Sequence, residues 1–325
     1  MDWLDALKGL GILAVVAGHI YPGFGGRTVY LFHMPLFFFI GGVLLKPTAD
    51  SLQFFRRKCV HLLIPYFSYL CLLYLPSLFY FLRDSSEHTW HSAAKMIAPA
   101  IIGGRMLSGT MAVFWFVTCF FFTQQIVNYL VANWKHRHIL ILMGVFLSLS
   151  YGNSLLLPKV WLPLNINVVF GAAPWFYAGY LYRLGRLRLH FGCAALLAIL
   201  SIVLLNAGYG VAYNMKNGIY GVPILSIVFA ISWICVLIAV ARFSSRIGLL
   251  SVPLKQLGIA SMTIMFMHQA IQICLQTKLG VQSDSLRFLA AVTLPCILFR
   301  ALEMNAYTRI LFLGRMESRA FKVQL

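Results

Sequence analysis

Charged residues are scarce in this chain, and acidic residues are the scarcest. Of 325 residues, 8 are Asp or Glu and 26 are Lys or Arg, so that charged residues make up only 10% of the chain. Soluble domains carry about 25% charged residues, whereas this chain is 61% hydrophobic with a mean hydropathy of +0.83. A soluble core cannot absorb that much apolar surface. The scarcity of charge therefore excludes a soluble globular protein and predicts a chain that lies in lipid.

Closely spaced cysteine pairs, internal repeats and basic tails are also absent. The 7 cysteines are scattered, mostly in apolar runs, and none forms a CxxC pair, so we expect them to be packing residues. The formal net charge of +18 comes from basic residues in short loops between apolar runs. We therefore exclude nucleic acid as a partner and interpret these residues as determinants of membrane topology.

The hydropathy pattern predicts an all-α integral membrane protein with about ten transmembrane helices of about 17–23 residues. The expected spans cover about 4–20, 29–45, 60–82, 111–131, 139–157, 164–182, 191–209, 222–241, 257–276 and 286–302. The stretch at about 96–110 is apolar but broken by Pro99 and Gly103, so we expect a re-entrant or interfacial segment there. We expect a single membrane domain over 1–325, with no appended soluble domain.

Basic residues set the expected orientation. Counted over alternate loops, Lys and Arg number about 17 on one side and about 8 on the other, and Lys8 within the first span completes the 26. Lys216 and Arg287 fall among the loop residues of the poorer side. The bias predicts that both termini lie in the cytoplasm. The tail at about 301–325 is expected to lie along the membrane surface as an amphipathic helix.

The first expected span carries three ionisable residues on one stripe. From Lys8 to His19 is eleven steps of about 100° and about 1.5 Å, so the two side chains share a face and lie roughly 16 Å apart along the axis. Asp5 falls within about 40° of that face. Each such group costs about 2.5–3.5 kcal/mol to place in a membrane, so the stripe is expected to face the protein interior or a water-filled cavity.

Three histidines from three spans are expected at a similar depth. The predicted topology places His19, His33 and His268 in the outer third of the membrane. One such histidine is typical of an interhelical hydrogen bond, but three at one depth predict a shared polar cavity. A metal site is disfavoured, because no two of them lie three or four residues apart on one helix and no carboxylate lies at that depth.

Five short motifs along the chain match the pattern of a known protein family. They are DALKGLGILAVVAGH at 5–19, FHMPLFFFIGG at 32–42, FRRK at 55–58 followed by LIPY at 63–66, WF at 115–116 and LGIASMTIMFMH at 257–268. Together they resemble the acyltransferase 3 family of integral membrane acyltransferases, and most closely its fucose 4-O-acetylase-like branch, which includes polysaccharide O-acetyltransferases. Two positions depart from the family pattern: Lys8 stands where many members carry arginine, and Gly41-Gly42 where many carry Ser-Gly.

The resemblance implies a reaction and a set of catalytic residues. The donor would be a cytoplasmic acyl-CoA, with acetyl-CoA foremost, and the acceptor a hydroxyl of a sugar in a cell-surface or exported glycan. His19 would take the proton of that hydroxyl, or else carry the acyl group itself. His33 and His268 would line the acceptor side, where one of them would stabilise the tetrahedral oxyanion.

The resemblance also implies residues that bind the donor. Lys8, steadied by Asp5 three residues before it, would hold the CoA phosphates together with the basic cluster that follows the second span. The candidate substrate-binding residues are Asp5, Lys8, Arg56, Arg57, Lys58, Trp115 and Ser261. No permanently bound cofactor and no metal are expected, the partners are acyl-CoA, a glycan or lipid-linked sugar and membrane lipids, and the location is a bacterial cytoplasmic membrane. The oligomeric state stays open.

A proton-coupled transporter or exporter is the alternative interpretation, because multiple spans with histidines at mid-depth also describe such carriers. The sequence shows no repeat between its halves and no matching pair of interrupted helices, which weighs against a carrier. The two classes differ in their handling of acyl-CoA, which an acyltransferase consumes and a carrier does not.

Overall fold

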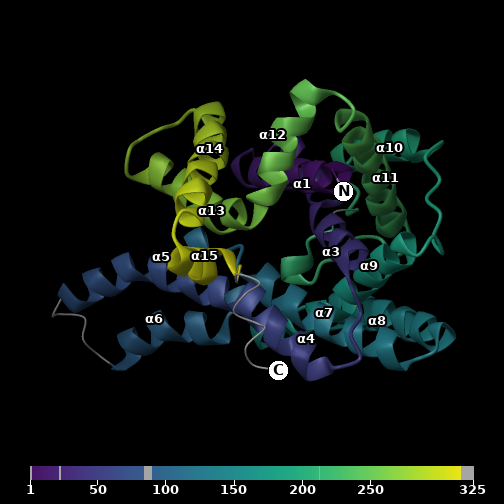
Figure 1. The fold of residues 1–325 in the computed structure, drawn as a ribbon, viewed down its shortest axis with the longest axis horizontal. Coiled ribbons are helices and arrows are strands. Elements are labelled where there is room, and N and C mark those ends of the chain that lie inside the picture. The colour runs from purple at the N-terminus through teal and green to yellow at the C-terminus, as the bar shows by residue number, and fades with distance from the viewer. Residues whose placement is uncertain (1, 22, 84–89, 212, 316–325) are drawn as a thin grey trace.

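A computed structural model describes residues 2–21, 23–83, 90–211 and 213–315, and the regular structure in these ranges is helical (Figure 1). In chain order the elements are α1 Asp2–Ile20, α2 Phe24–Val29, α3 His33–Leu44, α4 Ser51–Lys58, η1 Cys59–Leu63, α5 Ile64–Arg83, α6 Trp90–Ile102, η3 Gly104–Met106, η4 Gly109–Met111, α7 Trp115–Asn133, α8 His136–Leu156, η5 Pro163–Asn165, α9 Val168–Arg183, α10 Ala194–Asn206, η6 Met215–Asn217, α11 Leu225–Ser244, α12 Gly248–Ile259, α13 Ser261–Thr277, α14 Asp284–Glu303 and α15 Ala306–Leu313.

The prediction of a multi-pass helical membrane protein is confirmed, but its count of ten spans is not. Among the described residues, seven helices are long and apolar enough to cross a membrane, or up to eight if α12 and α13 form one broken span. α9 has 16 residues and α10 has 13, whereas a straight crossing needs about 20. The stretch at about 96–110 contains the end of α6 and the 3₁₀ turns η3 and η4.

Two further expectations concern the end of the chain. The span expected at about 257–276 is not one straight helix, because α12 and α13 meet at 77° around Ala260. Of the tail expected at the membrane surface, the described part forms α15, which packs against α5 and α14 (Figure 1). Residues 316–325 lie outside the described residues.

Large apolar side chains cover the outer surface of several helices. On α8, for example, Ile141 is 63% exposed and Leu156 is 79% exposed. α10 exposes Leu196 and Ile199, and α14 exposes Ile297 in the same way. Soluble proteins rarely leave such extensive apolar surface in water, so these faces are the ones that lipid covers.

Glycines bring the two helix pairs around the site into backbone contact. A Cβ on Gly258 of α12 would overlap the carbonyl oxygen of Asp5 in α1, and a Cβ on Gly9 would overlap that of Leu254. α3 and α9 meet in the same way through Gly42 and its counterparts on α9. Small residues at such contacts are how membrane helices approach closely. Gly42, in the Gly41-Gly42 pair that replaces the family's Ser-Gly, is thus a point of close backbone contact.

Adding one methyl group at Gly42 is expected to destabilise the protein by about 1–3 kcal/mol. In Gly42→Ala the new Cβ meets the backbone of Phe176, which cannot move aside as a flexible side chain would. Gly144→Ala on α8 is the matched control, because a Cβ there meets nothing within 4 Å. Thermal unfolding of both detergent-solubilised variants measures the difference, and equal melting temperatures would contradict the close contact.

Candidate active site

A cavity of about 480 Å³ is lined by residues of α1, α3 and α7 and by residues of η6 and of the helices from α12 to α15. Its walls are largely apolar and include Ile12, Val15, Phe37, Ile40, Phe116 and Met265. Lys8 and His19 both line it, so the cavity follows the face of α1 that the sequence analysis singled out. The two residues are roughly 16 Å apart along a helix, which gives the cavity a Lys8 end and a His19 end.

Three histidines gather at the His19 end. The ring centroids of His19 and His268 are 5.3 Å apart. The ring of Tyr30, between α2 and α3, stands edge-on to both His19 and His33, at centroid distances of 6.2 Å and 5.0 Å. His19 and His33 line the cavity, whereas His268 is fully buried behind His19. The side chains that the predicted topology placed at one depth therefore lie together.

Backbone hydrogen bonds set the protonation pattern of two of these rings. Nδ1 of His33 donates to the carbonyl of Val29 at 2.7 Å, and Nδ1 of His268 donates to that of Ile264 at 2.9 Å. A carbonyl only accepts, so in each neutral ring Nδ1 carries the proton and Nε2 is a bare acceptor. Nε2 of His268 is buried without a hydrogen-bond partner among the described residues.

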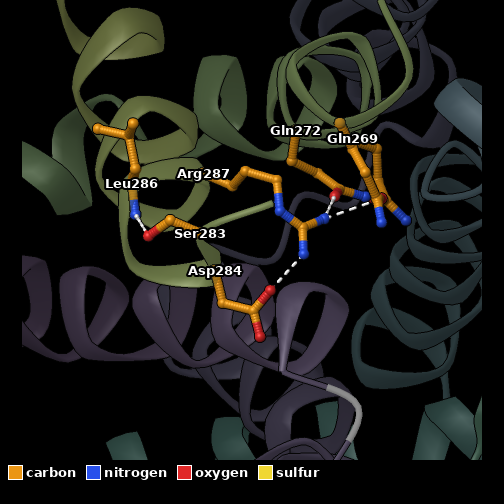
Figure 2. A network of polar contacts seen from close by, with 7 residues as sticks. Gln269, Gln272, Ser283, Asp284, Leu286 and Arg287 are labelled. Atoms are coloured by element: carbon orange, nitrogen blue, oxygen red, sulfur yellow. Dashed lines mark hydrogen bonds and ion pairs between the residues drawn. The ribbon is translucent and has the colours of Figure 1, made fainter. Parts of the chain in front are cut away.

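A buried arginine, Arg287, stands at the start of a hydrogen-bond chain through Gln272 and Gln269 (Figure 2). Arg287 of α14 is only 6% exposed and forms an ion pair with Asp284. Its guanidinium donates to the side-chain oxygens of Gln272 at 3.1 Å and Gln276 at 2.8 Å, both on α13. The sequence analysis counted Arg287 among loop cations, and the structure corrects this, because the side chain is inside the protein.

Two glutamines carry this chain of contacts to the imidazole. Nε2 of Gln272 donates to Oε1 of Gln269 at 2.6 Å, and Nε2 of Gln269 lies 3.2 Å from Nδ1 of His19. Gln269 is also in the cavity wall. We call Arg287, Gln272 and Gln269 the relay, and it joins the first turn of α14 to His19 near the end of α1.

The Lys8 end of the cavity is basic. Lys8 and Asp5 form the ion pair predicted from their spacing, with Nζ and Oδ1 2.6 Å apart. His61 and Arg315 also line the cavity, and Arg315 is held 2.7 Å from Glu303. His61 lies on η1, a single π-helical turn, which is a feature often found at functional sites.

The basic cluster after the second expected span divides between two environments. Arg56 and Arg57 are exposed and do not line the cavity. Lys58 is half-buried, and both Arg57 and Lys58 pack over the ring of Phe54, with cation-to-centroid distances of 5.5 Å and 5.3 Å. Lys58 is not in the cavity wall either, so the structure brings none of these three side chains to the cavity lining.

The 3₁₀ turns between the long helices position a lysine in the cavity wall at the His19 end. Nζ of Lys216 on η6 donates to the carbonyl of Leu107 at 2.8 Å, and the Lys216 carbonyl accepts from Asn165 at 3.2 Å. Lys216 is close enough to His19 to act on it electrostatically. Burial, together with the nearby guanidinium of Arg105, lowers the pKa of the Lys216 ammonium from its usual value.

The remaining candidate residues also border the cavity. Trp115 opens α7, is 5% exposed and lines the wall. Ser261 is the first residue of α13, at the 77° bend, and lines the cavity as well. In the part of the chain that the structure describes, no three His, Cys, Asp or Glu side chains are grouped in a way that would hold a metal ion.

Sequence reasoning missed Gln269, Gln272, Arg287, Lys216 and Arg315 as site residues. Gln269 and Gln272 lie within one turn of His268 on α13, which was a usable signal. Nothing local marked the two distant cations, because only the fold brings Lys216 and Arg315 to the cavity.

These features define a class of protein: a multi-pass helical membrane protein with an interior polar site reached through an apolar cavity. A family model described as an acyltransferase domain matches residues 1–301, which is most of the chain. The protein therefore belongs to the acyltransferase 3 family, whose members are membrane enzymes that transfer acyl groups. No curated protein and no solved structure matches it.

Proposed function

We propose that this protein is an O-acyltransferase of a bacterial cytoplasmic membrane. It would move an acyl group, foremost acetyl, from cytoplasmic acyl-CoA to a hydroxyl of a sugar in a cell-surface or exported glycan, or in its lipid-linked precursor. The observation that carries the proposal is the cavity with a basic Lys8 end and a histidine-lined His19 end. This shape suits a donor with an anionic head and a reactive thioester at the tip of a long arm.

The basic end would bind the head of the donor. Lys8 and Arg315, which both line this end, would supply the charge that CoA phosphates need. Arg56 and Arg57 are exposed on α4 and would attract the anion before it enters. The pantetheine arm would then follow the apolar wall past Trp115 and Ser261 towards His19. With both chain termini on the cytoplasmic side, this entrance would face the compartment that holds acyl-CoA.

The histidine end would carry out the chemistry. A sugar hydroxyl is a poor nucleophile at neutral pH and needs a general base, and the oxyanion that forms needs hydrogen-bond donors. Imidazoles can supply both. The sequence-based hypothesis gives the base role to His19 and the supporting roles to His33 and His268. His19 is indispensable whether it takes the proton or stabilises the oxyanion.

The test is made on purified protein in lipid nanodiscs with labelled acetyl-CoA and a cell-envelope glycan fraction. We expect label to appear as a base-labile ester on the glycan while free CoA thiol is released. Mass spectrometry of the surface glycan with and without the gene identifies the acetylated sugar. If acetyl-CoA is neither consumed nor bound, the proposal fails.

Removing the charge of Lys8 is expected to weaken donor binding. A charge-assisted hydrogen bond contributes about 1.5–3 kcal/mol, so Lys8→Met should raise the KM for acetyl-CoA roughly 10–100-fold with little change in kcat. Lys8→Arg keeps the cation and is the matched control. With acetyl-pantetheine, which lacks the nucleotide phosphates, wild type and Lys8→Met should behave alike, and an equal loss with this donor would contradict the role.

A transporter remains the second candidate, and one observation favours it. The 77° break between α12 and α13 is of the kind that forms substrate sites in carriers. Proteoliposomes separate the two functions: a carrier moves solute without consuming acetyl-CoA, whereas the proposed enzyme consumes it without net solute flux.

A further inference from the structure

The relay behind His19 has a single direction, because its first member can only donate. A guanidinium has no acceptor, so the atom of Gln272 that faces Arg287 must be the amide oxygen. The amide nitrogen of Gln272 then faces Gln269 and must meet its oxygen. The two ends of a glutamine amide are normally assigned from their hydrogen bonds, and here the arginine decides that assignment for both residues.

This direction fixes the neutral form of His19. With its oxygen engaged by Gln272, Gln269 presents its NH₂ group to Nδ1 of His19, 3.2 Å away. Nδ1 therefore accepts, and the proton of the neutral imidazole sits on Nε2. His33 has the opposite tautomer, because its Nδ1 donates to the Val29 carbonyl and its Nε2 therefore carries no proton. The two rings that line the cavity are thus complementary: His19 has a donor to offer and His33 an acceptor.

We propose that the relay makes His19 the hydrogen-bond donor of the site and leaves the role of general base to His33. The assignment rests on the proposed acyl transfer. Nε2–H of His19 hydrogen-bonds the thioester carbonyl oxygen as negative charge develops on it. Nε2 of His33 removes the proton of the acceptor hydroxyl as its oxygen attacks the carbonyl carbon. The C–O bond forms, the C–S bond breaks, and the proton passes from His33 to the departing thiolate, giving the ester and CoA thiol.

His268 is the other ring with a bare Nε2, but its position does not suit the base. His268 is fully buried, does not line the cavity, and packs against the His19 ring. A base must come within hydrogen-bond reach of the proton that it removes. Only His33 combines a bare nitrogen with a place in the described cavity wall. Gln272 and Arg287 act through His19 and are positioning residues.

A single isosteric substitution should reverse the direction of the hydrogen bonds that Gln269 makes in the relay. In Gln272→Glu the new carboxylate accepts from Arg287 and has no proton for Gln269. Gln269 then turns its NH₂ group to the carboxylate and its oxygen to His19, whose Nδ1 must now carry the proton. Gln276→Glu is the matched control, since it places the same charge beside Arg287, while Gln276 makes no hydrogen bond to Gln269 or His19 in the described part of the chain.

The measurement is ¹⁵N NMR of histidine-labelled full-length protein in nanodiscs at about pH 8, where free imidazoles are neutral. The His19 signals are identified by their loss in His19→Asn. We expect the His19 proton on Nε2 in wild type and in Gln276→Glu, and on Nδ1 in Gln272→Glu. A proton on Nδ1 in wild type, or the same tautomer in both glutamate variants, overturns the proposal.

Kinetics give a second readout that a merely structural role would not produce. Removing one oxyanion donor costs about 10²–10³-fold in kcat, so Gln272→Glu should lose that much with the KM for acetyl-CoA unchanged, and Gln276→Glu should stay near wild type. Equal kcat in the two variants contradicts the donor role. The NMR result does not depend on turnover, so a confirmed tautomer with no acyl transfer by wild type would reject the proposed function separately.

Discussion

Replacing His19 with alanine is expected to lower acyl transfer by about 10²–10⁴-fold. The ring lies where the cavity meets the relay, between His268 and Tyr30, so its removal takes away the polar group at the proposed point of reaction. The KM for acetyl-CoA should change little, because the proposed phosphate site is at the Lys8 end. The measurement is steady-state transfer from labelled acetyl-CoA by protein in nanodiscs.

His138→Ala is the matched control for this loss, since His138 is exposed on α8 and does not line the cavity. Both variants should be produced at wild-type levels, which quantitative immunoblotting of the membrane fraction checks. Full acetylation by His19→Ala at a normal protein level would remove His19 from the chemistry altogether.

His33→Gln is expected to lower transfer to a sugar hydroxyl by a similar factor of about 10²–10⁴, for a different reason. The amide fills much of the space of the ring but cannot take up a proton at neutral pH. The loss should therefore fall on acceptors that need deprotonation. The side chain is only 5% exposed, so thermal unfolding must accompany the kinetics to show that the fold is intact.

Hydroxylamine separates the two histidines, because its amine attacks a thioester without prior deprotonation. His33→Gln should keep transfer to hydroxylamine within about 10-fold of wild type, whereas His19→Ala should lose both reactions. If His33→Gln lost both acceptors equally, His33 would not be the base.

The sequence predicted the face of α1 well because a helix has a fixed period. Lys8 and His19 needed only the 100° rotation per residue to be placed on one stripe. The depth of His33 and His268 needed only the alternation of spans, since the direction of each span sets which end of it lies at a given level. These arguments are local or topological, and they reach the correct neighbourhood without knowledge of packing.

The relay was beyond such reasoning, because its members come from two helices whose rotation the sequence does not specify. Arg287 is near the start of α14, where a basic residue is ordinarily a solvated anchor. It is buried here because α13 presents Gln272 and Gln276 to it, one turn apart on the same face. No sequence motif around either glutamine predicts its hydrogen bond to Arg287.

The count of ten spans is not confirmed, for a related reason. Hydropathy measures the length of an apolar run and does not detect where the run bends. The run around Ala260 divides into α12 and α13 because α12 is fixed against α1 at Gly258, while α13 continues towards α14. The apolar run that contains α10 is likewise long enough in sequence, but its helix has only 13 residues.

If the proposed function is correct, the limited size of the cavity links the choice of donor to the choice of acceptor. About 480 Å³ must receive the end of one substrate and the reacting edge of the other at the same moment. Under the proposed function, every methylene added to the acyl chain would take room from the incoming sugar, so a restriction to short acyl groups and the room left for the sugar would have one common cause. A variant that trims the wall at Phe37 or Phe116 would relax both together.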